Sequence, residues 1–150
     1  METHLAGEDL FSLRNLTRFR SYLTGSIGDL KRKVICILDQ VFSEYQSVFS
    51  DIFGKTSKEI LMQFSSPMDF EEIPSGTLAE LLAKLSRLKI GSEKAEQLKN
   101  AARHSFGVTF AQDSFTFQLK ALLSQISFIE DQINDTDAEI ASIMEKLDSP

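Results

Sequence analysis

The chain has few of the residues that form cross-links or bind metals. In 150 residues, cysteine occurs once, as Cys36, and histidine twice, as His4 and His104. A single cysteine cannot form a disulfide bond within the chain, which agrees with a reducing cytoplasm, and its place beside an apolar repeat predicts a small buried side chain. Neither histidine has a cysteine or a second histidine at the spacing of metal ligands. We therefore interpret both histidines as ordinary surface or helix-end residues.

Long apolar runs and an excess of positive charge are also missing. No apolar run approaches the roughly 18 residues of a membrane span, and the N-terminus lacks the basic-then-apolar order of a signal peptide. Lys and Arg number 16 against 22 Asp and Glu, for a net charge of −6, so no overall positive field would attract nucleic acid. A phosphate-binding loop of the Gly-Lys-Ser type is absent. Acidic residues such as Asp131 and Asp135 are spaced as the solvated flank of a helix, not as a metal site.

What the chain does have is an apolar residue at every third or fourth position in two long stretches, one near each end. This repeat is typical of helices that pack along their whole length against another helix. In the first stretch Arg20 occupies one position of the repeat, and in the second Thr136 is the polar position. The other members of the first seam are Leu13, Leu16, Leu23, Ile27, Leu30, Val34, Ile37, Val41 and Val48. The other members of the second seam are Phe115, Leu119, Leu122, Ile126, Ile129, Ile133, Ile140, Ile143 and Leu147.

Between the two stretches the pattern predicts short amphipathic helices. We expect the first long helix to begin near Glu8 or Asp9 and to end just before Gly54. Helix-capping signals then predict four new helix starts, at Thr56 with Glu59, at Ser66 with Pro67 and Asp69, at Thr77 with Glu80, and at Thr109 with Gln112. Gly107, just before the last of these starts, is expected to terminate the preceding helix. The short helices are expected at 57–64, 67–73, 77–87 and 92–105. Their expected core is Phe53, Ile60, Leu61, Phe64, Phe70, Ile73, Leu78, Leu81, Leu82, Leu85, Ile90, Leu98, Ala101 and Phe106.

The order of these segments predicts an all-α fold, an antiparallel hairpin of two long coiled-coil helices with a small helical tip subdomain. We assign the first long helix to residues 1–53, the tip to 54–108 and the second long helix to 109–150, as one structural unit. β-branched residues at one repeat position and leucine at the other would also suit a parallel dimer. The spacing does not distinguish pairing within one chain from pairing between two chains. A four-helix arrangement of two hairpins would satisfy both.

Two groups of basic residues are candidates for nucleic-acid contact. Arg14, Arg18 and Arg20 lie close together in the first helix, where they could bind phosphates or pair with acids on a facing helix. The segment from Arg87 through Lys89 to Lys94 resembles the turn of a helix-hairpin-helix unit, which contacts a DNA backbone through helix N-terminal amides. A plain turn before a helix is the favoured interpretation of this second group.

The residues also resemble a known family. LRNLTRFRSYL, followed by IGDLKRKVICILDQVFSEYQSVFSDIFGKTSKEIL, is similar to the middle segment of the DEDD-type transposases of the IS-one-ten insertion-sequence family. LLAKLSRLKIGSEKAEQL and ARHSFGV resemble the variable helical insert of that family, and FQLKALLSQISFIEDQI resembles its following helix. The resemblance covers the chain from about Leu5 to Leu147. Its most specific pieces are FGKTSKE at 53–59 and LTRFR at 16–20.

The resemblance implies a part of a larger protein. Family members have a nuclease-like domain of the Holliday-junction-resolvase fold with four metal-binding acids, then this helical segment, then a domain with a nucleophilic serine. None of these catalytic residues is assigned here, because the chain is expected to lie between the two domains. In the family the central coiled coil is expected to bring subunits together, while the flanking domains hold DNA and a structured noncoding RNA.

Residues and resemblance together favour a non-catalytic dimerisation segment of an insertion-sequence transposase, which acts in DNA transposition and recombination. We expect a homodimer with no cofactor, no small-molecule substrate and no membrane, in a prokaryotic cytoplasm, associated with the nucleoid when full length. The alternative is a nucleic-acid-binding module that contacts DNA or RNA backbones through its basic helix residues. A stand-alone helical enzyme is disfavoured, because no catalytic constellation is found.

Overall fold

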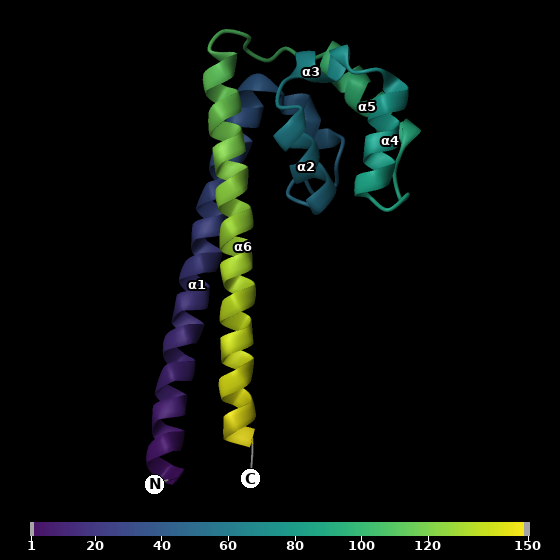
Figure 1. Ribbon diagram of the computed structural model, residues 1–150. Coiled ribbons are helices and arrows are strands. Elements are labelled where there is room, and N and C mark those ends of the chain that lie inside the picture. Colours follow the sequence, from purple (N-terminus) through teal and green to yellow (C-terminus); the bar gives the residue numbers. More distant parts are fainter. Residues whose placement is uncertain (1, 149–150) are drawn as a thin grey trace. The chain divides into compact units, whose positions relative to one another are not determined.

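The protein is all-helical. The computed structural model describes residues 2–148, with the side chains of residues 6–148, and no strand occurs among them (Figure 1). Two long helices stand at the ends of the sequence, and a 3₁₀ helix and four short α-helices lie between them. The elements are α1 (Glu2–Val41), η1 (Ser43–Ser47), α2 (Lys55–Gln63), α3 (Pro67–Glu72), α4 (Ser75–Leu85), α5 (Ser92–Arg103) and α6 (Gln112–Asp148).

Contacts within the chain divide it into two compact units. The first unit comprises Met1–Leu30 and Ser124–Pro150, and the second comprises Lys31–Leu123. Each long helix therefore contributes one part to each unit. These boundaries differ from the domain boundaries that the sequence predicted at residues 53 and 108.

The first unit is a pair of helix segments, one from α1 and one from α6. They lie side by side and run in opposite directions, with both chain termini at the same end (Figure 1). Leu23, Ile27 and Ile126 are buried between them. Thr136, the polar member of the second seam, is only 5% exposed. Its hydroxyl donates to the carbonyl of Gln132 at 2.7 Å, so a polar residue can occupy the seam without an unsatisfied donor.

In the second unit, α1 ends earlier than predicted. The helix stops at Val41 rather than before Gly54, since the backbone of Phe42 leaves the helical region with φ −161° and ψ 63°. This change of direction turns Phe42 and Tyr45 into the core, where both are fully buried. Val48, predicted as a member of the first seam, is also buried, but it follows η1 instead of lying on α1. Burial of these aromatic side chains outweighs continuation of the helix.

An aromatic cluster forms the core of the second unit. The ring of Phe42 lies 5.6 Å from those of Tyr45 and Phe70, and the rings of Phe64 and Phe70 are 5.5 Å apart. These tilted arrangements are favourable for aromatic pairs. Around the cluster, α5 packs against α3, α4 and η1, and α2 packs against α4. The other fully buried apolar side chains of this unit are Val34, Leu38, Ile60, Leu61, Leu78, Leu82, Ala95, Leu98, Leu119 and Leu123.

The short helices lie close to their predicted positions, but only one of their capping predictions is confirmed. Ser66 and Asp69 form a complete capping box at the start of α3, with Pro67 as the first helical residue. Thr56 and Thr77 lie inside α2 and α4, and those helices are preceded by Gly54 and Pro74 without a side-chain cap. The predicted Thr56 and Thr77 boxes are therefore wrong, because each helix begins at least one residue before its threonine.

The chain returns to α1 through a close backbone contact at Gly107. A Cβ atom at this position would overlap with the carbonyl group of Val41, and the next N–H, of Val108, donates to the carbonyl of Gln40 at 2.9 Å. The residue must be glycine for this reason and not because it terminates a helix with positive φ, as predicted. The predicted box of Thr109 with Gln112 is also wrong, since Gln112 is itself the first residue of α6.

Two further predictions about burial are wrong. Cys36 is exposed, because the buried positions Val34, Leu38 and Val41 define one face of α1 and Cys36 lies on the opposite face. Phe106, predicted in the core, is 94% exposed. It lies in the segment between α5 and α6, where the backbone contacts α1 and the ring points outward.

Replacing Ile126 by alanine should destabilise the first unit. Ile126 is fully buried, and removal of a buried isoleucine side chain down to Cβ costs about 2–5 kcal/mol. Gln125→Ala at the adjacent exposed position is the control and should change the free energy of unfolding by less than about 0.5 kcal/mol. Urea denaturation followed by circular dichroism measures both. Equal stability of the two variants would contradict the assignment of Ile126 to the seam.

Tyr45→Phe should destabilise the second unit at neutral pH by about 1–2 kcal/mol. The Tyr45 hydroxyl lies 2.6 Å from the hydroxyl of Ser57, which is 1% exposed and would lose its partner. Burial raises the pKa of the Tyr45 phenol. The unfolded chain therefore releases this proton first, and wild-type stability falls as the pH rises above the unfolded pKa of about 10.

The variant has no phenol at position 45, so its stability should depend less on pH in this range. Urea denaturation at pH 7 and at pH 10.5 measures the free energy of unfolding of both proteins. The exposed Tyr22 is present in both of them, so its ionisation does not contribute to the difference. A stability difference that stayed constant between the two pH values would show that Tyr45 ionises normally in the folded protein.

Candidate interaction surfaces

An ion pair joins the two helices of the first unit. Arg20 on α1 binds Asp137 on α6 through two hydrogen bonds, from Nε to Oδ1 and from Nη2 to Oδ2 at 3.3 Å. The two side chains are 43% and 46% exposed. The hydrogen bonds and the opposite charge lower the pKa of Asp137 and raise that of Arg20. Arg20 therefore already forms an ion pair within the chain, and this favours its predicted role in helix pairing over a role in phosphate contact.

The other two arginines of this group have no such partner. Arg14 and Arg18 are exposed and form no ion pair or hydrogen bond with another residue whose side chain is described. Large aromatic side chains lie on the same part of α1. Phe11 and Tyr22 are 68% and 67% exposed, and the ring of Phe19 stacks on that of Tyr22 with 6.2 Å between centroids. This part of α1 is therefore basic, aromatic and accessible.

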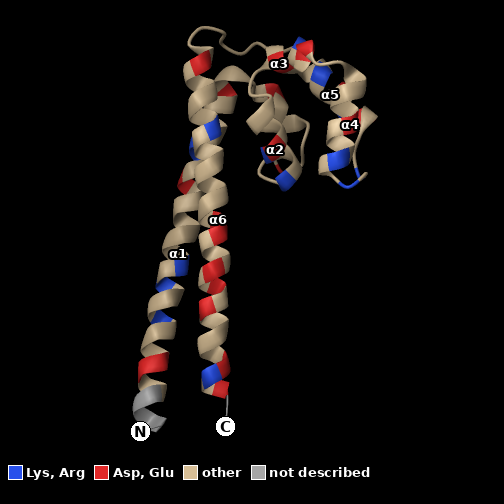
Figure 2. Ribbon diagram, viewed as in Figure 1, with Lys and Arg blue, Asp and Glu red and all other residues tan. Residues whose placement is uncertain are grey.

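The neighbouring part of α6 carries the opposite charge. Figure 2 shows that in the first unit most Lys and Arg residues belong to α1 and most Asp and Glu residues belong to α6. Asp131, Asp135 and Glu139 are exposed, and none has an ion pair or hydrogen bond with a described side chain. Phe128 on the same helix is 63% exposed. The net charge of −6 thus hides two helix surfaces of opposite sign.

The second predicted basic group lies around the turn between α4 and α5, and only part of it is free to contact a nucleic acid. Arg87 and Lys89 are exposed, and Leu88 between them is 85% exposed. Lys94 is not free, because its ammonium group donates to the carbonyl of Val48 at 2.6 Å and lies 5.5 Å from the centre of the Phe49 ring. Arg87 and Leu88 adopt positive φ values of 56° and 68°. The turn brings two basic residues to the surface and uses the third to hold α5 to the segment after η1.

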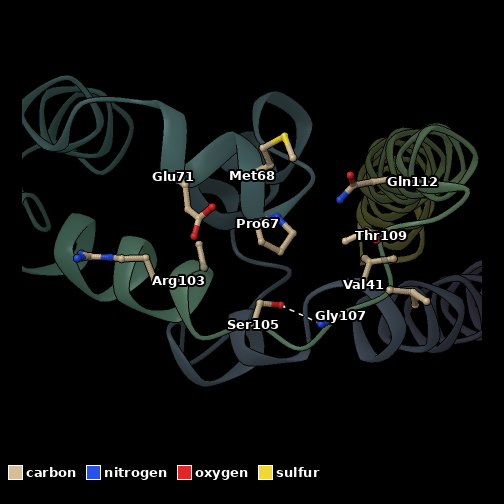
Figure 3. Close-up of a pocket in the computed structure, with 11 residues that line it drawn as sticks. Val41, Pro67, Met68, Glu71, Arg103, Ser105, Gly107, Thr109 and Gln112 are labelled. Atoms are coloured by element: carbon tan, nitrogen blue, oxygen red, sulfur yellow. Dashed lines mark hydrogen bonds between the residues drawn. The ribbon is translucent and has the colours of Figure 1, made fainter.

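A small cavity lies in the second unit beside the end of α1. Its volume is about 190 Å³, and its lining includes Val41, Met68 and Gln112 (Figure 3). The lining is mixed, and Arg103 extends away from the other labelled side chains (Figure 3). Pockets that enclose small-molecule ligands are larger, roughly 300–1,000 Å³. This cavity beside Gly107 is smaller than that range.

The groups that could support catalysis do not come together in the described residues. His104 lies at the end of α5, where its Nδ1 is 2.8 Å from the carbonyl oxygen of Asn100, in agreement with the predicted helix-end role. The side chain of His4 lies outside the described residues. No three potential metal ligands of the His, Cys, Asp and Glu types lie together in the part of the chain that the structure describes. In that same part, no helix combines the length and the apolar character needed to cross a membrane.

The predicted seam residues are all at least partly buried, and they divide between the two units. The most buried ones are Leu23, Ile27, Val34, Ile37, Val41, Leu119 and Ile126. The partly buried ones are Leu16, Leu30, Leu122, Ile129, Ile133, Ile140, Ile143 and Leu147. Leu38 and Leu123 are fully buried but were not predicted, because the seven-residue repeat selects one position per turn and misses the additional positions that a straight helix buries.

The apolar repeat did not predict the exposed aromatic residues of the first unit. Phe11, Phe19, Tyr22 and Phe128 lie outside both seams, so the apolar repeat does not select them. They could have been recognised in the sequence as aromatic residues at helix positions that the repeat predicts to be exposed to solvent.

Comparisons of the chain with models of protein families, with curated proteins and with solved structures gave no match.

Asp137→Asn should lower the melting temperature at neutral pH by a small amount, as expected for a partly exposed ion pair. Because the pKa of Asp137 is lowered in the folded protein, its contribution is present above the unfolded pKa and is lost as the pH falls through the folded pKa. The difference between wild type and variant should therefore vanish in acid. Asp131→Asn, which removes an exposed acid without a described partner, is the control. A pH-independent difference would show that the amide disturbs packing and not the ion pair.

Proposed function

We propose that the chain is a non-catalytic association segment of an insertion-sequence transposase and joins two copies of its protein through the first unit. The proposal combines the resemblance to the DEDD-type transposases of the IS-one-ten family with the character of the exposed residues. It includes the finer description of the fold, in which α1 and α6 pair as an antiparallel coiled-coil hairpin. The antiparallel helix segments and the Arg20–Asp137 bridge of the first unit support that description.

The observation that carries the proposal is the amount of apolar surface that the helix pair leaves uncovered. The seam residues Ile129, Ile133, Ile140 and Ile143 of α6 remain partly accessible. Outside the seam, the first unit exposes further large apolar side chains on both of its helices. These are Leu10, Phe11, Phe19, Tyr22, Phe128 and Met144. Exposed large apolar side chains of this kind are typical of a protein–protein interface, and self-association of identical chains is its commonest form.

Two copies of the first unit would form a four-helix arrangement. In such a bundle each helix contacts two neighbours, so that positions beside the seam become buried as well as the seam itself. Helix stability comes mainly from packing of apolar faces. Association therefore supplies contacts that one helix pair lacks. In the full-length protein, we propose that these contacts hold together two recombinase subunits whose other domains bind DNA and a structured noncoding RNA.

A nucleic-acid-binding module is the second candidate. Its support is the exposure of Arg14, Arg18, Arg87 and Lys89, although Arg20 and Lys94 are engaged within the chain. The acidic surface of α6 next to the arginines of α1 opposes binding of a polyanion. Salt-dependent retention on DNA or RNA belongs to this second candidate alone.

The association proposal predicts that the isolated chain is a dimer. Light scattering at several protein concentrations should give twice the mass of one chain, 16.9 kDa, at the upper end of the micromolar range. The melting temperature should rise with protein concentration, because association stabilises the folded state by mass action. A mass of one chain at every concentration, with a constant melting temperature, would overturn the proposal.

A further inference from the structure

We propose that the two copies pack side by side in the same direction, so that α1 of each copy lies on α6 of the other. This inference rests on the proposed self-association and specifies the surface and the symmetry through which it occurs. It follows from the position of the exposed aromatic residues around the two helices and from the distribution of charge between them.

Three of the four exposed aromatic residues of the first unit lie on one side of the helix pair. An α-helix turns about 100° per residue, which places Phe19 and Tyr22 on one flank of the α1 seam, and Phe128 and Asp135 on one flank of the α6 seam. In each helix this flank contains residues that directly precede a seam position in the sequence, as Phe19 precedes Arg20. Because both helices are right-handed and run in opposite directions, equivalent flanks lie on the same side of the pair. This surface, the aromatic side, therefore contains residues of both helices.

The aromatic side is accessible and contains residues of the kind found in interface cores. Phe19, Tyr22 and Phe128 are 45%, 67% and 63% exposed. Aromatic residues are enriched in the cores of protein interfaces, where they contribute large areas of apolar contact. The opposite side of α1 has the small or polar residues Thr17, Ser21 and Thr24 and one exposed large apolar residue, Leu10, so it offers no aromatic area. The aromatic side is thus the better surface for a second copy.

The charges of the two helices then select one of two possible arrangements. If the symmetry axis lies across the helices, α1 meets α1 and α6 meets α6, so that the acids of α6 face acids. If the axis runs parallel to the helices, α1 of one copy meets α6 of the other. Opposite charges are then adjacent in both contacts, which are equivalent by the two-fold symmetry.

The heights of the charged residues along the pair agree with the second arrangement. Arg20 and Asp137 are level with one another, because they form an ion pair. Counting outward in opposite directions at about 1.5 Å per residue, Arg18 is level with Glu139 and within a helical turn of Asp135. A symmetry axis parallel to the helices preserves these heights. Arg18 of one copy therefore lies beside Asp135 and Glu139 of the other, and none of the three has a described partner within its own chain.

Charge reversal tests this geometry. Arg18→Glu places acids against acids in both contacts, and the double variant Asp135→Arg with Glu139→Arg places bases against bases. Each variant alone should dissociate at least about tenfold more readily than wild type, because like charges at an interface are unfavourable. An equimolar mixture of the two should form a mixed dimer in which both contacts join opposite charges. Light scattering measures the masses, and native mass spectrometry separates mixed from identical pairs.

The matched control is Arg14→Glu, which makes the same change of charge on the same helix. Arg14 lies away from the aromatic side, so this variant should dimerise like wild type. Circular dichroism of every variant establishes that the helices are retained. Recovery on mixing excludes misfolding, since mixing does not alter electrostatics within a chain.

The possible outcomes distinguish this inference from the proposed function. Dissociation of each variant with recovery on mixing supports the arrangement. If wild type dimerises and the reversed variants dimerise equally well, the arrangement is wrong while self-association stands. If wild type is a monomer, self-association itself is wrong. If wild type is a monomer that binds a single-stranded RNA and Arg18→Glu abolishes that binding, the surface belongs to a nucleic-acid interface and both proposals are overturned.

Discussion

The second unit depends on a backbone contact that leaves no room for a side chain. Gly107 passes against the carbonyl group of Val41, and Val108 donates a hydrogen bond to Gln40. The last carbonyl groups of a helix lack partners within the helix, and this contact supplies one for α1. It also brings the chain back to the end of α1 just before α6 begins at Gln112. Any larger residue at position 107 would have to move the start of α6 or the end of α1.

The first unit depends on a different feature, the separation of charge between its two helices. The basic residues of this part of α1 and the acidic residues of α6 are attracted to each other within the chain, as the Arg20–Asp137 pair shows. Because this pair is partly exposed, its contribution is mainly to orientation and register rather than to overall stability. Near this pair, the exposed charges of α1 are the basic Arg14 and Arg18, and those of α6 are the acidic Asp131, Asp135 and Glu139. A net charge near −6 conveys none of this, since it averages over both surfaces.

The basic residues show why a candidate site can be predicted only in part. Their positions in the sequence indicate two groups, but they do not indicate which side chains are used within the chain. Arg20 binds Asp137, 117 residues further along, and Lys94 binds a carbonyl group 46 residues before it. Such partners are distant in sequence, so no local spacing predicts them. The exposed aromatic residues of the first unit escaped prediction for a related reason, because an apolar repeat identifies the face that is buried and not the apolar residues outside it.

The sequence by itself determined that the chain is helical, where most short helices lie, which positions of the long helices are at least partly buried, and that Ser66 with Asp69 caps α3. These features depend on periodicity and on contacts between residues three or four apart, which are local. Only the tertiary structure decided that α1 ends at Val41, that Cys36 and Phe106 are exposed, and that Gly107 serves close approach. Each of these depends on contacts between segments distant in sequence: burial of Phe42 and Tyr45 in an aromatic core, the orientation of α1 against its neighbours, and the return of the chain past the end of α1. Where local preference and distant packing compete, the larger apolar area buried by packing prevails.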